Sequence, residues 1–356
     1  MPFKNDLVLR AFTDQRLPCP PIWLMRQAGR YLPEYRATRS KAGGFMDLCR
    51  SPSFCAEVLL QPLERFDLDA AILFSDILTV PDAMGLGLSF GVGEGPRFAR
   101  PLRDEAAVKA LTVPDMGALQ YVFDAVAECK RALTQQGPES GAGSLQRVPL
   151  IGFSGSPFTL ACYMIEGSGS TDGFPLTRRM MLQRPELFQQ VLEVNVSAVT
   201  AYLAGQIEAG ADLLMLFDTW GGLLSPRLYR ERSLAPMQRI VASIKAQSPH
   251  VPVVIFSRGA AHSVAAMSTS GAHGLGVDWQ SDLVDVRAAA GPNMTLQGNF
   301  DPLLLTTGAA TVRRELAKSL AGFDAHHRYI ANLGHGITPD ADPHLVETLV
   351  QTLRAA

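Results

Sequence analysis

Two arginines and a glycine stand where an apolar run ends near the N-terminus. In WLMRQAGRYLPEYR (residues 23–36), the apolar residues stop and Arg26, Gln27, Gly29 and Arg30 follow. Guanidinium groups are planar forks that bind carboxylates, and glycine lets a ligand approach the backbone closely. The segment therefore predicts a site for a polyanionic substrate. The alternative is that both arginines form ion pairs with carboxylates of the protein itself.

Polar side chains also end the other apolar runs of the chain. They are Ser75 and Asp76, Tyr163 after the third run, Asp218 and Thr219, Ser257 and Arg258, Asp278, Asn299 and Asp301, and Asn332 and His335. Asp76 could either serve a site or cap the following helix. His335 lies between two glycines in LGHGI, which predicts an exposed, mobile setting and favours a role in the site. The repetition along the chain, more than any single residue, indicates function.

The elements that must position these residues are eight short apolar runs, each followed by a longer helical pattern. The runs are 21–25, 70–75, 148–154, 212–217, 251–257, 274–279, 294–300 and 328–334, and helical patterns cover 119–135, 185–210, 229–247 and 311–323. Near-continuous apolar runs are typical of strands that are buried on both faces of a parallel sheet.

Eight strand–helix units predict an α/β fold, a single (β/α)8 barrel with parallel inner strands over residues 1–356. An open, doubly wound sheet is the alternative. A barrel gathers its chemistry at the C-terminal ends of the strands, where the polar residues stand. The glycines after Ala209 and Ala321 suit helix ends, and GPESGAGSLQR (137–147) is expected to be a surface loop.

The composition of the 356 residues narrows the function. A net charge of -2 gives no reason to expect nucleic acid or a membrane surface as a partner. Five scattered cysteines without a CxxC pair predict free thiols in a reducing compartment. The first residues lack a signal-peptide core and no run is long enough to span a bilayer, so a cytoplasmic location is expected.

Familiar cofactor and nucleophile motifs are missing from the sequence. It contains no HExxH, no His-x-Cys pair, no GxSxG and no Walker motif. FSGSPFT (153–159) resembles a phosphate-binding loop but lacks the required pattern, so this signal is weak. The sequence therefore predicts an enzyme that uses neither a cofactor nor a metal.

Seven segments resemble the motifs of the uroporphyrinogen decarboxylase family, in the same order and over nearly the whole chain. PIWLMRQAGRYLPEYR and GFSGSPFTLACYMIEG are similar to its two signature segments. FSDIL, LFDTWGG, GVDW, LQGNFDP and NLGHGITPDADP match as well. The resemblance implies a (β/α)8 barrel, usually a homodimer, that works without cofactor or metal. It removes the carboxyl groups of the four acetate side chains of uroporphyrinogen III, giving coproporphyrinogen III on the route to haem.

The resemblance also implies the residues of the site. Those expected in catalysis are Asp76, Arg26, Arg30 and Tyr163, and those expected to bind substrate are Arg26, Gln27, Ala28, Gly29, Arg30, Asp76, Tyr163, Thr219 and His335. This sequence departs from the family pattern at two positions. Thr219 keeps the hydroxyl of the serine found in some members, whereas Arg258 stands where lysine is more usual, which leaves its role open.

Two other functions are compatible with parts of this pattern. A related cobamide-dependent methyltransferase would need a zinc site with thiolate and histidine ligands. A non-catalytic tetrapyrrole carrier would need the arginines but not Asp76. Measuring release of carbon dioxide separates the carrier from the decarboxylase, and a zinc assay tests the methyltransferase.

Overall fold

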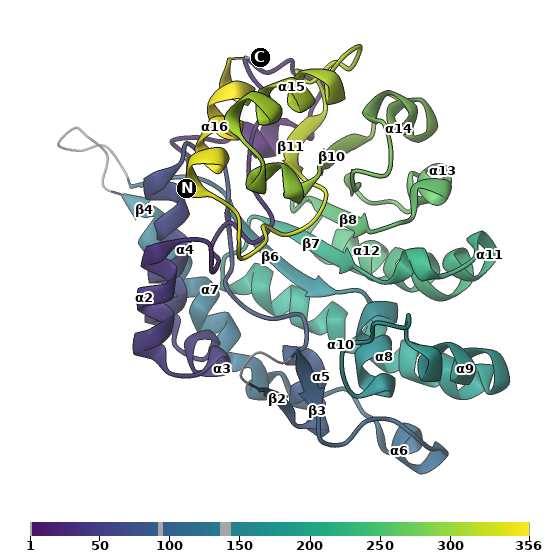
Figure 1. Cartoon of the computed structure of the whole chain (residues 1–356). Coiled ribbons are helices and arrows are strands. Elements are labelled where there is room, and N and C mark those ends of the chain that lie inside the picture. Colours follow the sequence, from purple (N-terminus) through teal and green to yellow (C-terminus); the bar gives the residue numbers. More distant parts are fainter. Residues whose placement is uncertain (1, 92–94, 136–143, 356) are drawn as a thin grey trace.

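A seven-stranded parallel sheet forms the centre of the molecule (Figure 1). The computed structural model describes residues 2–91, 95–135 and 144–355. The strands lie in chain order: β1 (Ala71–Ile72), β6 (Leu150–Gly155), β7 (Leu213–Asp218), β8 (Val253–Ser257), β9 (Gly274–Gly276), β10 (Thr295–Phe300) and β11 (Tyr329–Leu333). Every residue within the six strands β6 to β11 is buried, as the near-continuous apolar runs predicted.

Residues 21–25 occupy the eighth position, between β11 and β1, without forming a regular strand. Ile22 makes a single parallel bridge to Ala331, and its carbonyl accepts a hydrogen bond from the Asp69 backbone N–H at 2.7 Å. Pro20 and Pro21 have no N–H to donate to a ladder. The predicted strand is therefore reduced to one bridge, and the Asp69 carboxylate accepts the N–H of Ile22 instead. The parallel α/β barrel architecture is confirmed, with this correction.

Helices cover the outside of the sheet (Figure 1). They are α1 (Leu7–Arg10), α2 (Pro33–Ala42), α3 (Phe45–Cys49), α4 (Pro52–Arg65), α5 (Thr79–Pro81), α6 (Glu105–Ala110), α7 (Gln120–Leu133), α8 (Pro157–Glu166), α9 (Pro175–Gln183), α10 (Pro185–Ala209), α11 (Pro226–Leu228), α12 (Ala235–Gln247), α13 (Val264–Met267), α14 (Leu283–Ala290), α15 (Ala309–Ser319) and α16 (Pro343–Arg354). Two short antiparallel pairs are added, β2 (Leu88–Phe90) with β3 (Pro96–Phe98) and β4 (Thr134–Gln135) with β5 (Leu145–Gln146).

The helix predictions hold for the most part, with shifted boundaries. Helices α7 and α10 match their patterns, and Gly210 follows α10 with φ 120°. The pattern over 229–247 begins as a π-helical turn, Tyr229–Leu234, before α12, because Pro236 cannot donate to the helix ladder. Helix α15 ends at Ser319, before Gly322. Of the predicted loop 137–147, residues 137–143 lie outside the described residues, and Leu145–Gln146 is a strand.

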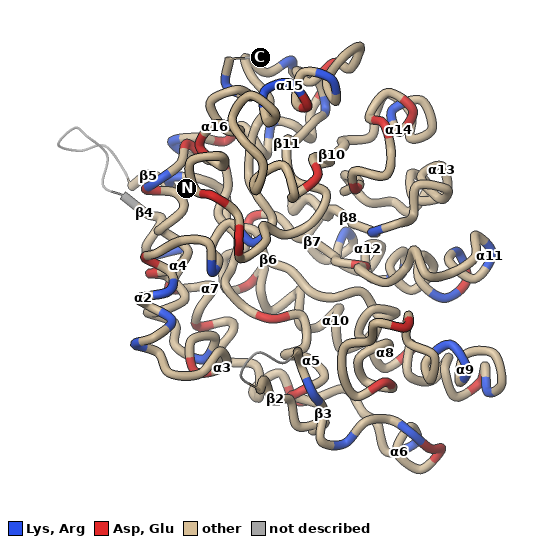
Figure 2. Tube along the Cα trace, in the orientation of Figure 1, with Lys and Arg blue, Asp and Glu red and all other residues tan. Residues whose placement is uncertain are grey.

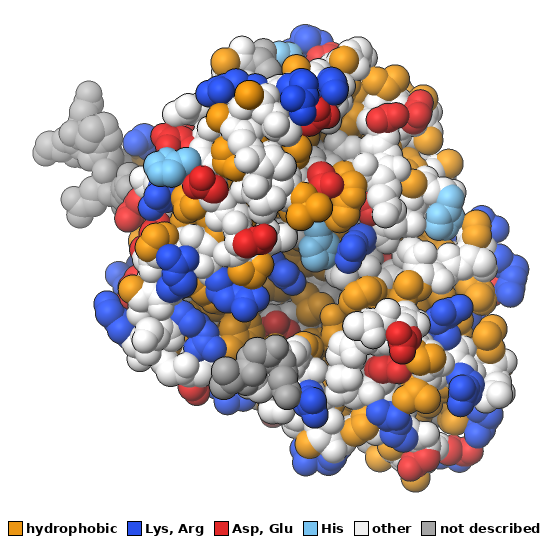
Figure 3. All heavy atoms as spheres, viewed as in Figure 1, with side chains coloured by type: hydrophobic (Ala, Val, Ile, Leu, Met, Phe, Trp, Pro, Cys, Tyr) orange, Lys and Arg blue, Asp and Glu red, His pale blue; other side chains and the backbone are white. Residues whose placement is uncertain are grey.

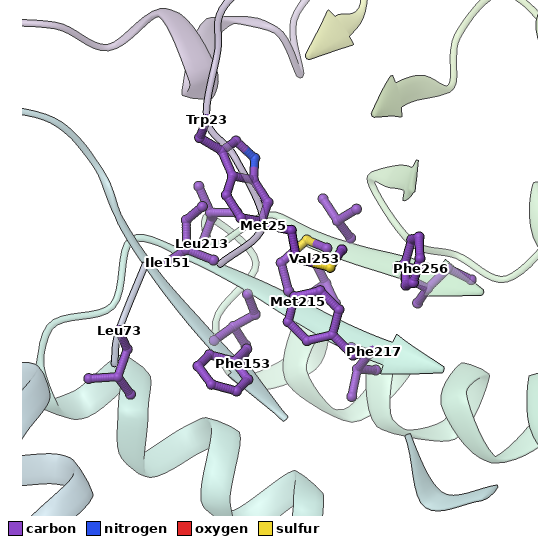
Figure 4. Packing of buried hydrophobic residues seen from close by; sticks show 14 of the residues in the cluster. Trp23, Met25, Leu73, Ile151, Phe153, Leu213, Met215, Phe217, Val253 and Phe256 are labelled. Carbon is purple, nitrogen blue, oxygen red and sulfur yellow. The ribbon is translucent and has the colours of Figure 1, made fainter. Parts of the chain in front are cut away.

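The barrel interior is filled by apolar side chains that also form the floor of the site. Figure 4 shows Met25, Met215, Phe153 and Phe217 gathered there, with Trp23 above them in the view. The rings of Phe153 and Phe217 meet edge to face with centroids 5.6 Å apart. Side chains from β6 and β7 therefore close the barrel beneath its C-terminal rim.

Candidate active site

A cleft opens at the C-terminal rim of the barrel (Figure 3). It encloses about 780 Å³ of empty space, counted out to its open mouth. Its lining residues are Met25, Arg26, Ala28, Ile72, Leu73, Phe74, Ser75, Asp76, Ile77, Phe153, Phe217, Thr219 and His335. Five of the nine predicted site residues are therefore brought together here, above an apolar floor that the sequence pattern assigned only to the core.

Asp76 is both a turn-capping residue and a cleft residue. Its Oδ1 accepts the N–H of Leu78 at 2.8 Å, and its backbone carbonyl accepts the Thr79 hydroxyl at 3.1 Å. Among the described residues, no donor bonds its other carboxylate oxygen. Loss of surrounding water raises the pKa of Asp76, against smaller lowering effects of the Leu78 N–H and the Arg26 charge. In the ligand-free protein the pKa of this carboxyl group is therefore above its usual range.

Arg26 lies in the same cleft, on a sharp turn of the backbone. Its φ of 63° is in the left-handed region, and its guanidinium charge lowers the pKa of Asp76. A Cβ on Gly29 would lie 2.9 Å from the Arg26 carbonyl oxygen. Glycine is thus required here by the turn itself, whereas the sequence had suggested space for a ligand.

Gln27 and Arg30 do not line the cleft. The buried side-chain amide of Gln27 accepts the Leu24 N–H at 3.1 Å and donates to the Ala70 carbonyl at 3.1 Å. It holds the turn against the start of β1, so its side chain is structural. Arg30 is exposed on the same turn, next to the cleft rather than inside it. The sequence predicted that the side chains of Arg26 and Arg30 both line the site. The structure places only that of Arg26 in the cleft lining.

Gly336 is a site residue that the sequence did not single out. A Cβ at this position would clash with Cδ, Cγ and Nε of Arg26, so the arginine side chain packs directly on the glycine. The segment LGHGI drew attention to His335 only. A glycine that makes room for a side chain distant in sequence leaves no local signal.

We expect Gly336→Ala to lower kcat/KM about tenfold while the protein stays folded. The new methyl group displaces a flexible side chain, not backbone, so the Arg26 guanidinium moves away from the cleft, and small misplacements of such groups are costly. Gly169→Ala is the matched control, because a Cβ there meets nothing within 4 Å. Equal activity of the two variants in steady-state assays would contradict the prediction.

Tyr163 on α8 stands beside the cleft. Its ring packs against Phe174, with centroids 5.5 Å apart, and against Trp220 at 6.3 Å. Burial raises the pKa of Tyr163, and the charges of Asp76 and Arg26 act on it in opposite directions. The hydroxyl therefore stays protonated near the two charged cleft residues.

Asp218 is not a cleft residue, although it ends β7 next to Thr219. It is fully buried and accepts hydrogen bonds from four hydroxyl groups. The donors are Ser156 at 2.6 Å, Thr159 at 3.2 Å, Ser233 at 2.7 Å and Ser257 at 2.9 Å. Two of the three hydroxyls of FSGSPFT, those of Ser156 and Thr159, are thus committed to this carboxylate, and the third, of Ser154, donates to the Gly155 carbonyl. Thr219, the next residue, is half-buried and faces the cleft.

Several other polar residues at the strand ends also hold the backbone rather than a ligand. Asn332 accepts the Met25 N–H at 3.0 Å, Asp278 accepts the Gly259 N–H at 2.6 Å, Asp301 accepts the Leu303 N–H at 2.9 Å, and Asn299 donates to the Ser281 carbonyl. Their common position at the rim predicted a functional cluster. The structure shows that about half of that cluster shapes the loops.

His335 is half-buried, which corrects the expectation of an exposed, mobile setting. Its ring lies 6.5 Å from that of Phe256, centroid to centroid. Burial and the charges of Arg26 and Arg258 lower the pKa of His335 to about 3. The imidazole is therefore neutral near pH 7 in the ligand-free protein.

An NMR titration tests the charge state of His335. Between pH 5 and 8 we expect its ring resonances to stay unchanged in the ligand-free protein, because the lowered pKa lies below this range. A midpoint for His335 near 6.5 would contradict the burial argument.

The cleft carries positive charge although the whole chain is slightly acidic. Within the described ranges, no carboxylate lies within ion-pair distance of the guanidinium groups of Arg26, Arg30 or Arg258. Figure 2 shows acidic and basic residues spread over the outer helices. The alternative that Arg26 and Arg30 pair with carboxylates of the protein is therefore not supported.

The described part of the chain offers neither a cluster of metal donors nor a membrane-spanning helix. There, no three His, Cys, Asp or Glu side chains are close enough together to hold a metal ion. No helix in the same part has the length and apolar character needed to cross a bilayer. The cysteines are free, and four of the five are buried.

Comparisons with known proteins place these features in a family. Residues 3–356 match the family model described as Uroporphyrinogen decarboxylase (URO-D). Uroporphyrinogen decarboxylases of Cupriavidus necator and Neisseria meningitidis are each 52% identical over 352 residues, 98% of this chain and 95% and 96% of theirs. A methyltransferase from Methanosarcina mazei superposes with a TM-score of 0.76 over 98% of this chain and 97% of its own. At 19% identity, it shows likeness of fold alone.

Proposed function

The chain belongs to the uroporphyrinogen decarboxylase family, and from this we propose that its rim cleft is the site where uroporphyrinogen is decarboxylated in tetrapyrrole biosynthesis. The observation that carries the proposal is that Asp76 and Arg26 line the same cleft without forming an ion pair. An acceptor without a full set of partners and a cation without a carboxylate suit a ligand that brings N–H groups and carboxylates together.

The reaction replaces each acetate carboxyl group by a hydrogen. A proton added to the pyrrole carbon next to the acetate-bearing carbon makes the ring cationic and iminium-like. The bond to the carboxylate then breaks, carbon dioxide leaves, and the electron pair enters the ring. Protonation of the exocyclic carbon gives the methyl group, and loss of the ring proton restores the pyrrole. Because the substrate is its own electron sink, the proposal needs no cofactor such as pyridoxal phosphate.

Asp76 is proposed to stabilise the cationic ring. An ionised carboxylate is an acceptor only, so it can collect the N–H groups of the macrocycle. These hydrogen bonds would lower the pKa that burial raises in the ligand-free protein and would keep the carboxylate charged. A preorganised negative charge beside a developing positive one is usually the largest single catalytic contribution.

The remaining residues are proposed to bind the eight carboxylates of the substrate. The forked guanidinium of Arg26 suits a carboxylate inside the cleft, and Arg30 a carboxylate at its mouth. The Thr219 hydroxyl, the neutral His335 ring and the Tyr163 hydroxyl are hydrogen-bonding groups around the same space. Backbone groups of residues 27–29, next to Arg26 and Arg30, are proposed to contact the same substrate.

Three further predictions about the protein stay open to test. They are that residues 1–356 form a single domain, that the protein is a homodimer, and that it works in the cytoplasm. Family membership supports all three, and the free cysteines suit a reducing compartment. Limited proteolysis of the purified protein tests the single domain, and sedimentation tests the homodimer.

Anaerobic incubation with uroporphyrinogen III tests the proposed function directly. The products are oxidised and separated by chromatography according to their number of carboxylates. We expect intermediates with seven, six and five carboxylates and then coproporphyrin. Bound but unchanged uroporphyrinogen, with no release of carbon dioxide, would instead indicate a carrier.

Arg30→Ala tests how the rim recognises charge. We expect a three- to tenfold higher KM for uroporphyrinogen, since about 1 kcal/mol is lost when an exposed charged contact is removed. The loss should shrink for intermediates that have fewer carboxylates left to bind. The same loss for every substrate in competition assays would argue against anchoring of a carboxylate that leaves.

A further inference from the structure

Arg258 is a cation at the C-terminal rim of the barrel, close enough to the cleft residue His335 for its charge to act there, and the proposed mechanism does not use it. It follows β8 directly and is half-buried. Its guanidinium lies over the Trp279 ring, 5.7 Å from the centroid. Stacking on an indole fixes the plane of a guanidinium and leaves its N–H edge free to donate. Within the described ranges, no carboxylate is close enough to pair with it.

The loop that carries Arg258 is held from two sides. Buried Asp278 accepts the Gly259 N–H at 2.6 Å and the Gln280 N–H at 3.1 Å, which ties the loop to the residues after β9. On the other side, a Cβ on Gly222 would clash with the carbonyl oxygen of Arg258. The loop after β7, which carries Thr219, therefore packs against the Arg258 backbone. A loop held this closely positions a side chain precisely.

The charge of Arg258 acts on the His335 side of the cleft. Both Arg26 and Arg258 act on His335 and help to keep its imidazole neutral. The ring of Phe256, two residues before Arg258 on β8, lies 6.5 Å from the His335 ring, centroid to centroid. Arg258 is therefore on the His335 side of the cleft, whereas Asp76 follows β1, which is separated from β8 by β6 and β7 in the sheet.

We propose that Arg258, stacked on Trp279, binds one of the four substrate carboxylates that the reaction retains. This inference rests on the proposed function of the cleft and adds a specificity residue to it. A retained carboxylate suits this position, because it keeps the macrocycle in place through four successive decarboxylations. The acetate that reacts lies closer to Asp76 and Arg26. A carboxylate between Arg258 and His335 also offsets the two cations that act on the imidazole.

Four proteins test the inference: wild type, Arg258→Met, Arg258→Lys and the control Arg313→Met. Arg313 is exposed on α15, away from the rim, and its replacement changes the net charge equally. The measurements are KM and kcat for the octacarboxylate substrate and the pentacarboxylate intermediate, and the inhibition constant of added coproporphyrinogen. Product inhibition reports binding without catalysis.

Arg258→Met should raise both KM values and the inhibition constant of the product by about tenfold, with kcat within about twofold of wild type. Arg258→Lys should stay within about threefold, because a point charge still attracts the carboxylate. Arg313→Met should match wild type.

Unchanged constants in Arg258→Met would overturn the inference, and so would a higher KM with an unchanged product inhibition constant, which would mean that Arg258 holds a leaving carboxylate. If thermal melting shows that Arg258→Met is not folded, Arg258→Gln serves as the neutral variant and is judged by the same criteria. Failure of the proposed function looks different, because wild type itself would then release no carbon dioxide.

Discussion

Asp76→Asn should retain the fold and lose about 100- to 1000-fold in kcat, the effect of removing one preorganised charge or dipole worth about 3–4 kcal/mol. The amide oxygen can still accept the Leu78 N–H, so the turn after β1 is preserved. A neutral amide cannot stabilise the cationic ring as a carboxylate does, and its NH₂ group opposes the pyrrole N–H groups. The measurement is single-turnover decarboxylation of uroporphyrinogen, with circular dichroism as the check of folding.

Asp115→Asn is the matched control, because Asp115 accepts the Gly117 N–H in the same local geometry, at 2.9 Å, but is exposed and away from the cleft. It should have wild-type activity. Near-normal decarboxylation by Asp76→Asn would refute the role proposed for this carboxylate.

Asp76→Asn should leave the melting temperature near neutral pH equal to or higher than that of wild type. The folded-state pKa of Asp76 is raised, so this group contributes most to stability at low pH, and that contribution is lost as the pH rises through the folded-state pKa. Asparagine carries no charge and avoids this loss. Thermal melts of wild type and Asp76→Asn at pH 7 and at lower pH test this. The difference between their melting temperatures should narrow as the pH falls.

Arg26→Ala should lower kcat/KM by about 30- to 100-fold, since a charge-assisted contact worth about 2–3 kcal/mol is removed from the centre of the site. It should also move the acid limb of the kcat/KM profile to higher pH. The Arg26 charge lowers the pKa of Asp76, so its removal raises that pKa, and the active carboxylate is protonated earlier as the pH falls.

Arg26→Lys separates the two contributions of this residue. Lysine keeps the charge but not the fork, so binding should weaken while the acid limb stays near its wild-type position. Arg313→Ala, on the outer helix α15, should behave like wild type. An acid limb that does not move in Arg26→Ala would show that the two side chains are not electrically coupled.

Burial and periodicity account for the part of the fold that could be predicted. Seven of the eight apolar runs form strands, because a segment that is apolar on both faces is stable only inside a covered parallel sheet. The eighth, residues 21–25, closes the barrel through one bridge, since Pro20 and Pro21 have no N–H to donate. That loss was visible in the sequence, but the replacement by the Asp69 carboxylate was not.

The candidate site was predictable to the extent that strand ends meet. Arg26, Asp76, Thr219 and His335 come from four different units and line one cleft, as the barrel rule requires. The family motifs added Tyr163 and the residues around Arg26. Neither argument separates Asp76, which faces the cleft, from Asp218, which is surrounded by four hydroxyl groups beneath it.

The sequence by itself therefore determined the barrel, the rim on which the chemistry gathers, and the acidic and basic residue types available there. These follow from local periodicity and from the order of the segments. The tertiary structure decided which polar groups remain available to a ligand, that burial and the charges of two arginines lower the pKa of His335, and that Gly336 makes room for Arg26. Such choices depend on distances between side chains hundreds of residues apart, and hydrogen bonding and desolvation act through those distances, not along the chain.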